Sequence, residues 1–512
     1  MHKFCFLMTV IFTGTIISCV RVTTYYVDPV QGNDESSGSS PGTAWKSIER
    51  VNRQKLNPGD SVLFSGGESF DGTLLFDSLD SGTKDAPVAV SSYGNGRAVV
   101  NGGKADACIA THCSYLCIQQ IDFKGDGRKN GNTGSGLVID GGAHVLIDSI
   151  DVSGFRENGI AVLDASDVRI THVHAHENGM AGIQSGRVHQ SPRKLLTKNL
   201  YIGDCITDNN PGNPVVLDNH SGSGIIISGA DSALVEYCLS KNNGWDMPWK
   251  GNGPVGIWVY HSNNVTIQRC ISHDNKSNPE GWDGGGFDLD GGVTNSVLQY
   301  NLSYHNAGPG YGLFQYLEAD SWSDNMARYN ISYNDGLEND SSGIHLWSGQ
   351  QSFKNMRNAQ VYNNLIVNET GRAVSYKHGD FPGLVFQNNI FISYREPVYG
   401  VHNQSVFNHN LFYRTGNQPV ADKKEGNIYA DPGVLSFLSC IPGTENPRSL
   451  DTLMLYPALP GAPWLGTGKF IRNNGGTDFN GRHLPPDSIQ ATDIGIYQYD
   501  YKTQNLQVFK KP

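Results

Sequence analysis

The sequence predicts an all-β fold, a parallel β-helix in which short strands stack coil upon coil. Two repeated patterns predict it: a four-residue corner with a central Asn or Cys, and a Gly followed by alternating apolar residues. The composition agrees, because 61 Gly and only 17% charged residues suit turns and short strands better than amphipathic helices. Since each repeat of a solenoid buries its apolar face against its neighbours, 512 residues need not form several ordinary domains.

The corner pattern recurs at intervals of roughly 20 to 35 residues, the range of solenoid repeats. When coils stack at about 4.8 Å, its Asn side chains are expected to form an internal ladder of amide hydrogen bonds. The corners are Asp204–Thr207, Tyr237–Ser240, Arg269–Ser272, Tyr300–Ser303, Tyr329–Ser332, Asn363–Ile366, Asn388–Phe391 and His409–Phe412, with Gln120, Ser149 and His172 at the equivalent place earlier.

Three cysteines, Cys205, Cys238 and Cys270, fall in the same column as the corner Asn residues. We expect them to be small buried residues with free thiols. A disulfide is the alternative, because adjacent coils bring Cα atoms within bonding range.

The Gly-led pattern indicates which side chains face the core. The first and third residues after the Gly are almost always Ile, Val or Leu, so they point inward and the second and fourth point outward. These strands are led by Gly136, Gly159, Gly224, Gly256, Gly286, Gly312 and Gly343.

The repeats are expected to occupy residues 108–430, within a stack of about 10–12 coils. Residues 22–107 would form the N-terminal cap and first coils. A short helix between Ala44 and Leu56, with Trp45, Ile48 and Val51 on one face, would close the open N-terminal end. The Pro-rich residues 431–512 predict an irregular C-terminal cover with a closing strand.

Residues 1–19 are typical of an export signal. Lys3 precedes an apolar segment, Phe4 to Ile17, that is too short to span a bilayer. Residues 16–19, which end in Cys19, resemble a bacterial lipobox; cleavage nearby without lipid is the alternative. We expect an exported lipoprotein on the cell surface or in the periplasm of a Gram-negative bacterium, bound to the outer membrane only through its lipid. No later segment is apolar enough to cross a membrane.

The formal net charge of −11 argues against a nucleic-acid partner, which requires a basic face. It also mildly disfavours a polyanionic substrate, although a local basic patch would override the average. The chain is expected to be a monomer.

Several segments outside the corners are also characteristic: Tyr26–Pro29, Pro58–Phe64, Ser92–Gly96 and Asp493–Tyr499. Together with the Asn column, they resemble the pectate-lyase-like superfamily of right-handed parallel β-helices over nearly the whole mature chain. The resemblance implies a secreted bacterial protein of a class in which many members degrade polysaccharides, and it implies a pectic or xylan-type substrate. It is specific for the fold and weak for the reaction.

The outward positions of the Gly-led strands change in character along the chain. Early coils carry small or aliphatic residues there, whereas later coils carry an aromatic strip with carboxylates and His in its middle. Sugar rings stack on such aromatics, so the strip predicts a glycan-binding groove; a satellite core under long loops is the alternative. The expected substrate-binding residues are Trp258, Tyr260, Trp282, Tyr316, Trp347, Lys377 and His378, and Phe314, Tyr376 and Asp380 are expected on the same face.

Asp288 and Asp290 are the expected catalytic pair. They stand two residues apart on one strand face, with Cβ atoms about 6.5–7 Å apart, which suits the two carboxylates of an inverting glycosidase. Glu318 is a third candidate, as the acid or nucleophile of a retaining mechanism, and His345 would orient the substrate or an Asp. The sequence thus predicts a glycoside hydrolase that acts on a plant or host glycan and requires no cofactor.

Two other functions remain open. Asp283, Asp288 and Asp290 are hard oxygen ligands for a possible Ca²⁺. In that case the resemblance implies a Ca²⁺-dependent polysaccharide lyase, with Lys377 or Lys250 as its base. The third possibility is a glycan-binding β-helix without activity, in which the same Asp residues only form turns.

A second metal site is conceivable on another strand, where His172, His174 and His176 alternate. His172 is expected to be structural, because it falls in the corner column.

Overall fold

The structure is a computed structural model that describes residues 22–186, 194–338, 342–349, 356–400, 404–416, 419–421, 423–458, 460–484 and 492–499. The expected signal and lipobox, including Lys3 and Cys19, lie outside the described residues. Within the described part of the chain, no helix is long and apolar enough to cross a membrane.

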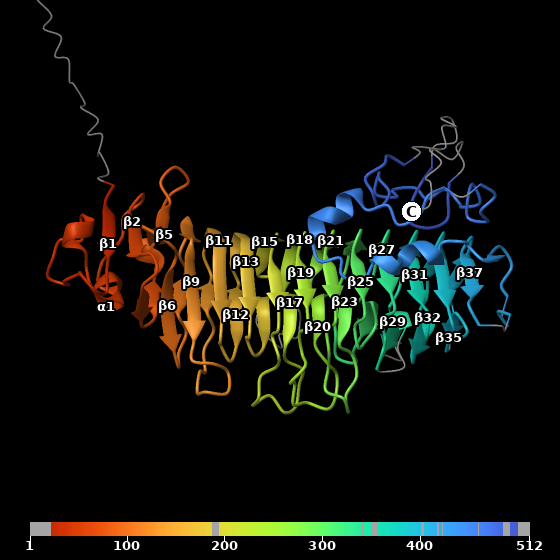
Figure 1. The fold of residues 1–512 in the computed structure, drawn as a ribbon, viewed down its shortest axis with the longest axis horizontal. Helices are drawn as coiled ribbons and strands as arrows, with labels where there is room; N and C mark the ends of the chain where they lie inside the picture. Colours follow the sequence, from red (N-terminus) through yellow and green to blue (C-terminus); the bar gives the residue numbers. More distant parts are fainter. Residues whose placement is uncertain are drawn as a thin grey trace, which may run out of the picture.

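The strands wind into a long parallel β-helix (Figure 1). A twelve-stranded sheet, called sheet B below, takes one strand from each of twelve successive coils, at the upper end of the expected number of about 10–12. A 26-stranded sheet, called sheet A, contains two columns that merge at the long strands β11 and β13. The strands of both sheets pair in parallel, so the predicted fold class is confirmed.

Sheet B consists of β4 (Leu74–Phe76), β7 (Cys108–Thr111), β10 (Leu137–Asp140), β12 (Asn158–Leu163), β14 (Ala181–Ser185), β17 (Ser223–Ser228), β20 (Val255–Tyr260), β23 (Gly285–Leu289), β26 (Tyr311–Gln315), β29 (Ser342–Ser348), β32 (Arg372–Lys377) and β35 (Val398–Tyr399).

The first column of sheet A consists of β1 (Thr24–Val27), β2 (Ser61–Ser65), β5 (Val88–Tyr93), β8 (Leu116–Gln119), β11 (Ala143–Ser153), β13 (Ser166–His176), β15 (Thr197–Gly203), β18 (Ala230–Glu236), β21 (Asn263–Gln268), β24 (Val297–Gln299), β27 (Met326–Arg328), β30 (Gln360–Tyr362), β33 (Val385–Gln387) and β36 (Val406–Asn408). The second column shares β11 and β13 and adds β3 (Ser69–Asp71), β6 (Ala98–Gly103), β9 (Ile121–Gly125), β16 (Ile206–Asp208), β19 (Leu239–Lys241), β22 (Ile271–His273), β25 (Leu302–Tyr304), β28 (Ile331–Tyr333), β31 (Leu365–Asn368), β34 (Ile390–Ser393), β37 (Leu411–Arg414) and β38 (Ile428–Tyr429).

The predicted Asn ladder is present at the corner between the two columns of sheet A. The backbone N–H and side-chain Nδ2 of Asn301 both donate to Asn330 Oδ1 at 3.1 Å, and the pattern repeats to Asn410. Earlier in the stack, Cys205, Cys238 and Cys270 are buried free thiols, as predicted. The residue before each ladder position has a left-handed backbone, for example Tyr329 with φ 51°.

His172, Ser149 and Gln120 do not occupy the ladder column, contrary to expectation. They occupy the left-handed position that precedes it, so the inward residue that follows His172 is Val173. The His172 side chain is 63% exposed, and its Nδ1 lies 2.8 Å from Asp148 Oδ1.

A second amide ladder, which the sequence analysis missed, lies at the corner between sheet A and sheet B. Asn243 Nδ2 donates to Asn275 Oδ1 at 2.9 Å, and Asn275 Nδ2 donates to Asn306 Oδ1 at 2.9 Å. The signal in the sequence is a second Asn five residues after the first ladder position. The ladder residues are Asn178, Asn210, Asn243, Asn275, Asn306 and Asp335.

The N-terminal end of the stack is closed as predicted, although by a shorter helix. Helix α1 (Ile48–Asn52) buries Ile48 and Val51, and Trp45 beside it is also fully buried (Figure 1). Two 3₁₀ turns, η1 (Pro41–Thr43) and η2 (Ser78–Asp80), also belong to this region.

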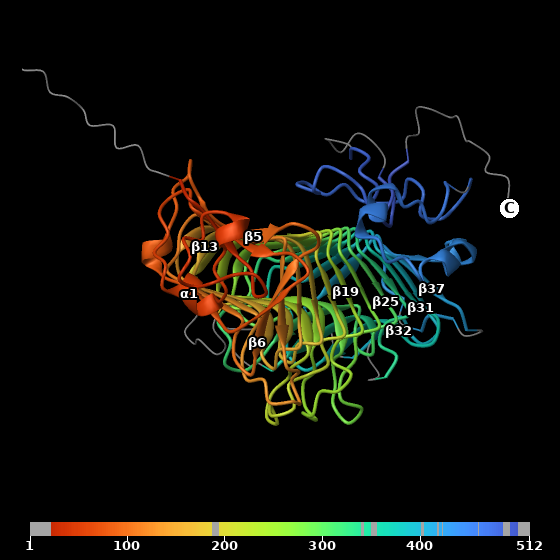
Figure 2. The same ribbon diagram turned by 60° about the vertical axis from the view of Figure 1, so that its left-hand side comes forward.

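The C-terminal segment lies along the side of the stack and covers the second column of sheet A (Figures 1 and 2). It contains η3 (Leu435–Cys440) and η4 (Pro447–Thr452), and its Trp464 and Ile496 belong to one apolar cluster with Ile331. Asp493 to Tyr499 were expected to form a closing strand, but they are irregular. Gly495 N–H instead donates to the Asn388 carbonyl at 2.7 Å.

The first ladder yields a stability prediction. Asn330→Ala removes the acceptor of the buried Asn301 N–H and of one Asn301 Nδ2 hydrogen, together with the donor to the Leu298 carbonyl, so we expect the free energy of unfolding to fall by about 2–3 kcal/mol. Urea unfolding followed by circular dichroism measures this change. The control is Asn95→Ala at an exposed turn, and an equal loss in both variants would show that the ladder contributes nothing specific.

Candidate functional site

The register of sheet B aligns the predicted site residues across successive coils. Trp258 on β20 pairs with Asp288 on β23, Asp288 pairs with Gly312 on β26, and Gly312 pairs with His345 on β29. Because strand side chains alternate, these positions all point away from the core. The outward face of sheet B therefore carries the carboxylates, as predicted.

Asp288 is the most buried of these carboxylates, with 3% of its surface exposed. Its Oδ1 has no hydrogen-bond partner among the described residues. Burial, followed by repulsion from Asp290 and Asp283, raises the pKa of Asp288 well above its usual range.

Asp283 precedes Asp288 in the sequence and Asp290 follows it. Both carboxylates are partly exposed. Burial raises the pKa of Asp290 to about 7, although a hydrogen bond from the Gly291 backbone opposes the shift. Burial also raises the pKa of Asp283 to about 6, against a hydrogen bond from Gly253 N–H at 3.2 Å and the charge of Lys377. The site thus holds carboxyl groups that titrate near neutral pH.

Gly312 creates space beside Asp288. A Cβ atom at this position would lie 3.0 Å from Asp288 Cγ and 2.8 Å from the Phe314 ring. The sequence pattern predicts Gly312 as the leading Gly of its strand, and the register places Gly312 and Phe314 at the outward positions. Phe314 thus points outward as predicted, but the outward pair of this coil is Gly312 and Phe314, two residues before the expected pair of Phe314 and Tyr316.

Tyr316 lies beyond the end of β26, where its hydroxyl is 2.6 Å from His261 Nε2. Glu318 follows it in an exposed turn, so it does not join the Asp residues on the strand face. Tyr376 is also misassigned: it pairs with the inward Leu346, is buried, and packs against Phe381 and Phe386 in the core.

His345 lies one coil beyond Gly312, and its Nδ1 is 2.6 Å from Ser375 Oγ. Burial, and to a lesser extent the charge of Lys377, lowers the pKa of His345 to about 4. The imidazole is therefore neutral at physiological pH and suits a hydrogen-bonding role better than an electrostatic one.

The predicted aromatic strip divides into a buried and an exposed part. Trp258 is only 4% exposed and belongs to a small apolar cluster, as in the satellite-core alternative, and Tyr260 stacks on it at 5.0 Å. Trp282 is 52% exposed, with Lys377 Nζ 5.4 Å from its ring centroid. Trp347 is half-buried against Phe314, and His378 is exposed.

Loops that precede the sheet B strands project from the stack (Figure 2), and side-chain contacts join several of them. Arg128 donates to the Gly212 carbonyl at 2.9 Å and forms an ion pair with Asp246. Lys250 pairs with Glu280 at 2.7 Å. These contacts join loops from four coils beside the outward face of sheet B.

The carboxylates of Asp283, Asp288 and Asp290 do not converge closely enough to form a cluster of three metal ligands. In the described part of the chain, the one group of three His, Cys, Asp or Glu ligand atoms that all lie within 4.8 Å of one another is elsewhere, at Asp151, His174 and His176. Ca²⁺ requires six to eight converging oxygens, typically at about 2.3–2.6 Å. The Asp283, Asp288 and Asp290 side chains are not such a group, so the alternative Ca²⁺ site would need further oxygens from the backbone or water.

Comparison with known proteins supports the fold directly. Residues 215–391 match the family model described as a right handed beta helix region. A GH136 lacto-N-biosidase from Eubacterium ramulus has a similar structure, with 17% identity, a TM-score of 0.52, and 75% of this chain and 67% of that chain covered. A PL6 family alginate lyase has a TM-score of 0.52 at 14% identity, covering 80% of this chain and 53% of that one.

Two curated proteins are also similar in sequence. A lacto-N-biosidase from Bifidobacterium longum subsp. longum is 23% identical over 88% of this chain, which spans 34% of the length of that protein. Alpha-1,3-galactosidase A from Akkermansia muciniphila is 36% identical over 66 residues, 13% of this chain and 11% of that protein. The chain is therefore a right-handed parallel β-helix whose relatives of this fold include glycosidases and polysaccharide lyases.

Proposed function

We propose that this chain is a glycoside hydrolase that cleaves a glycosidic bond on the outward face of sheet B. The observation that carries the proposal is the group of Asp283, Asp288 and Asp290, whose pKa values are all raised, beside exposed Trp282. The sequence similarity to a lacto-N-biosidase supports the same class of reaction.

The environments of the carboxyl groups favour different roles. Asp290, with a pKa of about 7, retains its proton near neutral pH and suits the general acid that protonates the leaving oxygen. Asp283, with a pKa of about 6, is mostly ionised and suits the base or nucleophile. Asp288 is buried and its pKa is raised well above the usual range, so we assign it to positioning.

The charges around the site favour a neutral glycan over a polyuronate. Lys250 is neutralised by Glu280, which leaves Lys377 as the main cation facing three Asp residues in the described part of the site. A uronate chain would require cations or a bound metal to offset its charge. This balance favours hydrolysis over Ca²⁺-dependent elimination.

The apolar faces of sugar rings would stack on Trp282 and Trp347, which border the carboxylates. We also propose that the protein acts outside the cytoplasm as a lipid-anchored enzyme, because residues 1–19 carry the features of an export signal with a lipobox. A host or plant glycan is then the accessible substrate.

Substituting the acid and base tests the proposal. Asp290→Asn and Asp283→Asn are each expected to lower kcat/KM by about 10²–10⁴-fold without unfolding the protein, because each removes one partner in proton transfer or attack. The assay is a mass-spectrometric digest of a neutral glycan panel that includes the glycans cleaved by lacto-N-biosidases.

Glu318→Gln is the matched control, since Glu318 is exposed beyond the strand and is expected to keep most of the activity. Near-normal rates in both Asn variants would contradict the assignment. Products that absorb in the ultraviolet as unsaturated uronates, together with inhibition by chelator, would indicate a lyase instead.

The two tryptophans should respond differently to substitution. Trp282→Ala is expected to raise KM about tenfold with little change in kcat, because it removes an exposed stacking surface. Trp258→Ala is expected to lower the melting temperature instead, because Trp258 belongs to a buried cluster and donates to Ser223 Oγ at 3.1 Å. Steady-state kinetics and thermal melts separate these effects, and a purely kinetic defect in the Trp258 variant would revise its role.

The raised pKa values also predict how stability depends on pH. Between about pH 4 and pH 7 the folded protein holds protons on Asp283 and Asp290 that the unfolded chain releases, so these groups make stability fall as pH rises. Asp290→Asn should therefore gain stability relative to the parent protein as pH rises through this window. Thermal melts at several pH values measure the difference, and a constant difference across the window would argue against a raised pKa.

A further inference from the structure

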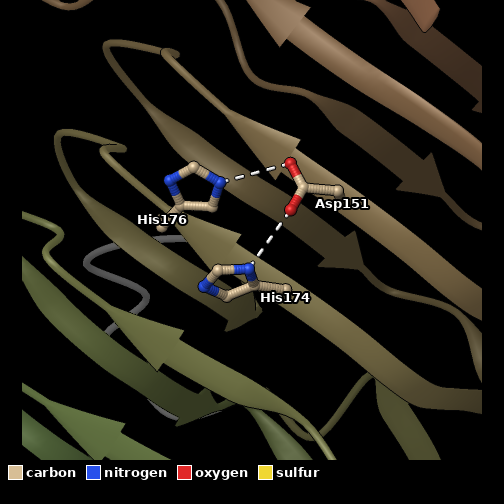
Figure 3. Close-up of side chains that lie close together, drawn as sticks. All are labelled: Asp151, His174 and His176. Atoms are coloured by element: carbon tan, nitrogen blue, oxygen red, sulfur yellow. Dashed lines mark hydrogen bonds and ion pairs between the residues drawn. The ribbon is translucent and has the colours of Figure 1, made fainter.

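A cluster of His and Asp lies on the outward face of sheet A, away from the carboxylates of sheet B. His174 and His176 stand two residues apart on β13, and β11 places Asp151 opposite His174 (Figure 3). Strand β16 places Asp208 opposite His176. Register therefore brings these four side chains together from three successive coils.

The contacts in this cluster fall into two kinds. His174 Nε2 lies 2.7 Å from Asp208 Oδ1, the length of a strong charge-assisted hydrogen bond. By contrast, His174 Nδ1 lies 3.2 Å from Asp151 Oδ2, and His176 Nε2 lies 3.2 Å from Asp151 Oδ1. Both contacts to Asp151 are longer than well-formed ion pairs of this type.

The longer distances match the spacing of metal ligands. With bonds of about 2.0–2.1 Å and tetrahedral angles, two ligand atoms of a zinc site stand about 3.3 Å apart. One nitrogen from each of His174 and His176 and an oxygen of Asp151 all lie within 4.8 Å of one another. Small side-chain rotations are therefore enough to place a divalent ion among them.

Asp208 adds a separate observation. Metal-binding His residues usually give their second nitrogen to a carboxylate, which fixes the ring and its tautomer. Asp208 holds Nε2 of His174 and leaves Nδ1 directed toward Asp151 and His176. The same strand supplies a contrast in His172, which is exposed and pairs with Asp148 alone.

The local charge also favours a cation. Asp151 and Asp208 are both carboxylates, and Asp122 accepts the Asp151 N–H at 2.8 Å from the neighbouring strand. Of the neighbouring cations, Arg97 lies 3.3 Å from Asp122 and Lys241 lies 2.8 Å from Glu445.

We propose that Asp151, His174 and His176 bind a divalent transition-metal ion of the zinc class, with Asp208 orienting His174. The imidazole nitrogens and the carboxylate are suitable donors for such an ion, and a water molecule completes a tetrahedral set. Since the ligands come from β11 and β13, the ion links two successive coils and stabilises the stack. The site is independent of the glycosidase assignment.

Titration of the chelator-treated full chain with Zn²⁺ in a calorimeter tests the proposal. We expect one tight site, a rise in melting temperature with Zn²⁺, and a tetrahedral absorption spectrum when Co²⁺ replaces Zn²⁺. Asp151→Asn, His174→Ala and His176→Ala should each weaken binding by more than about 30-fold, and Asp208→Asn by about 10–100-fold.

His172→Ala is the control and should bind Zn²⁺ as the parent does. Circular dichroism confirms that each variant is folded, and Asp151→Asn is nearly isosteric. The proposal fails if the parent shows no saturable Zn²⁺ binding, in which case the cluster is an ion-pair network. It also fails if the His174 and His176 variants bind Zn²⁺ with unchanged affinity.

Discussion

The parallel hydrogen bonding between coils is the constraint on which the rest of the structure depends. It fixes register, so each outward side chain lies beside its counterpart on the next coil. At the turns, the backbone N–H groups of ladder residues such as Asn301 donate to a side-chain amide oxygen and not to a main-chain carbonyl. Two buried amide ladders thus satisfy these groups, and they hold the corners from which the long loops of the candidate site begin.

Much of this fold could be predicted because the repeat is visible in the sequence. The Asn301 to Asn410 ladder and the three buried thiols follow directly from the corner pattern. The register of β26 could not be predicted, because either Gly310 or Gly312 could be the leading Gly of this strand. The inward residue there is Tyr311, whose hydroxyl donates to backbone carbonyls in the core, and an apolar pattern cannot indicate a polar group that is satisfied in this way.

The candidate site was predicted from alternation alone. Alternation indicates which way a side chain points but not how deeply it is buried. Asp288 and Asp290 do point outward, but alternation does not reveal that Asp288 is almost fully buried whereas Asp290 is partly exposed. Trp258 is covered by the segment that contains His220, whose ring packs edge-on at 5.1 Å. Contacts between residues far apart in sequence, such as Lys377 with Trp282, have no local signal. The sheet A cluster is similar: the alternating His residues were visible, whereas Asp151 came from the neighbouring coil.

The in-register column of sheet B has a consequence for molecules longer than one sugar. Each coil contributes one outward position to the column that runs from Trp258 through Asp288 and Gly312 to His345. Outward positions in this column are therefore spaced by about 4.8 Å, a step set by the backbone and unaffected by substitution, and a ligand lying along the stack would meet those whose side chains reach the surface. Single substitutions can therefore change recognition at one coil at a time. Insertion of a whole coil would lengthen the column without changing the spacing between coils.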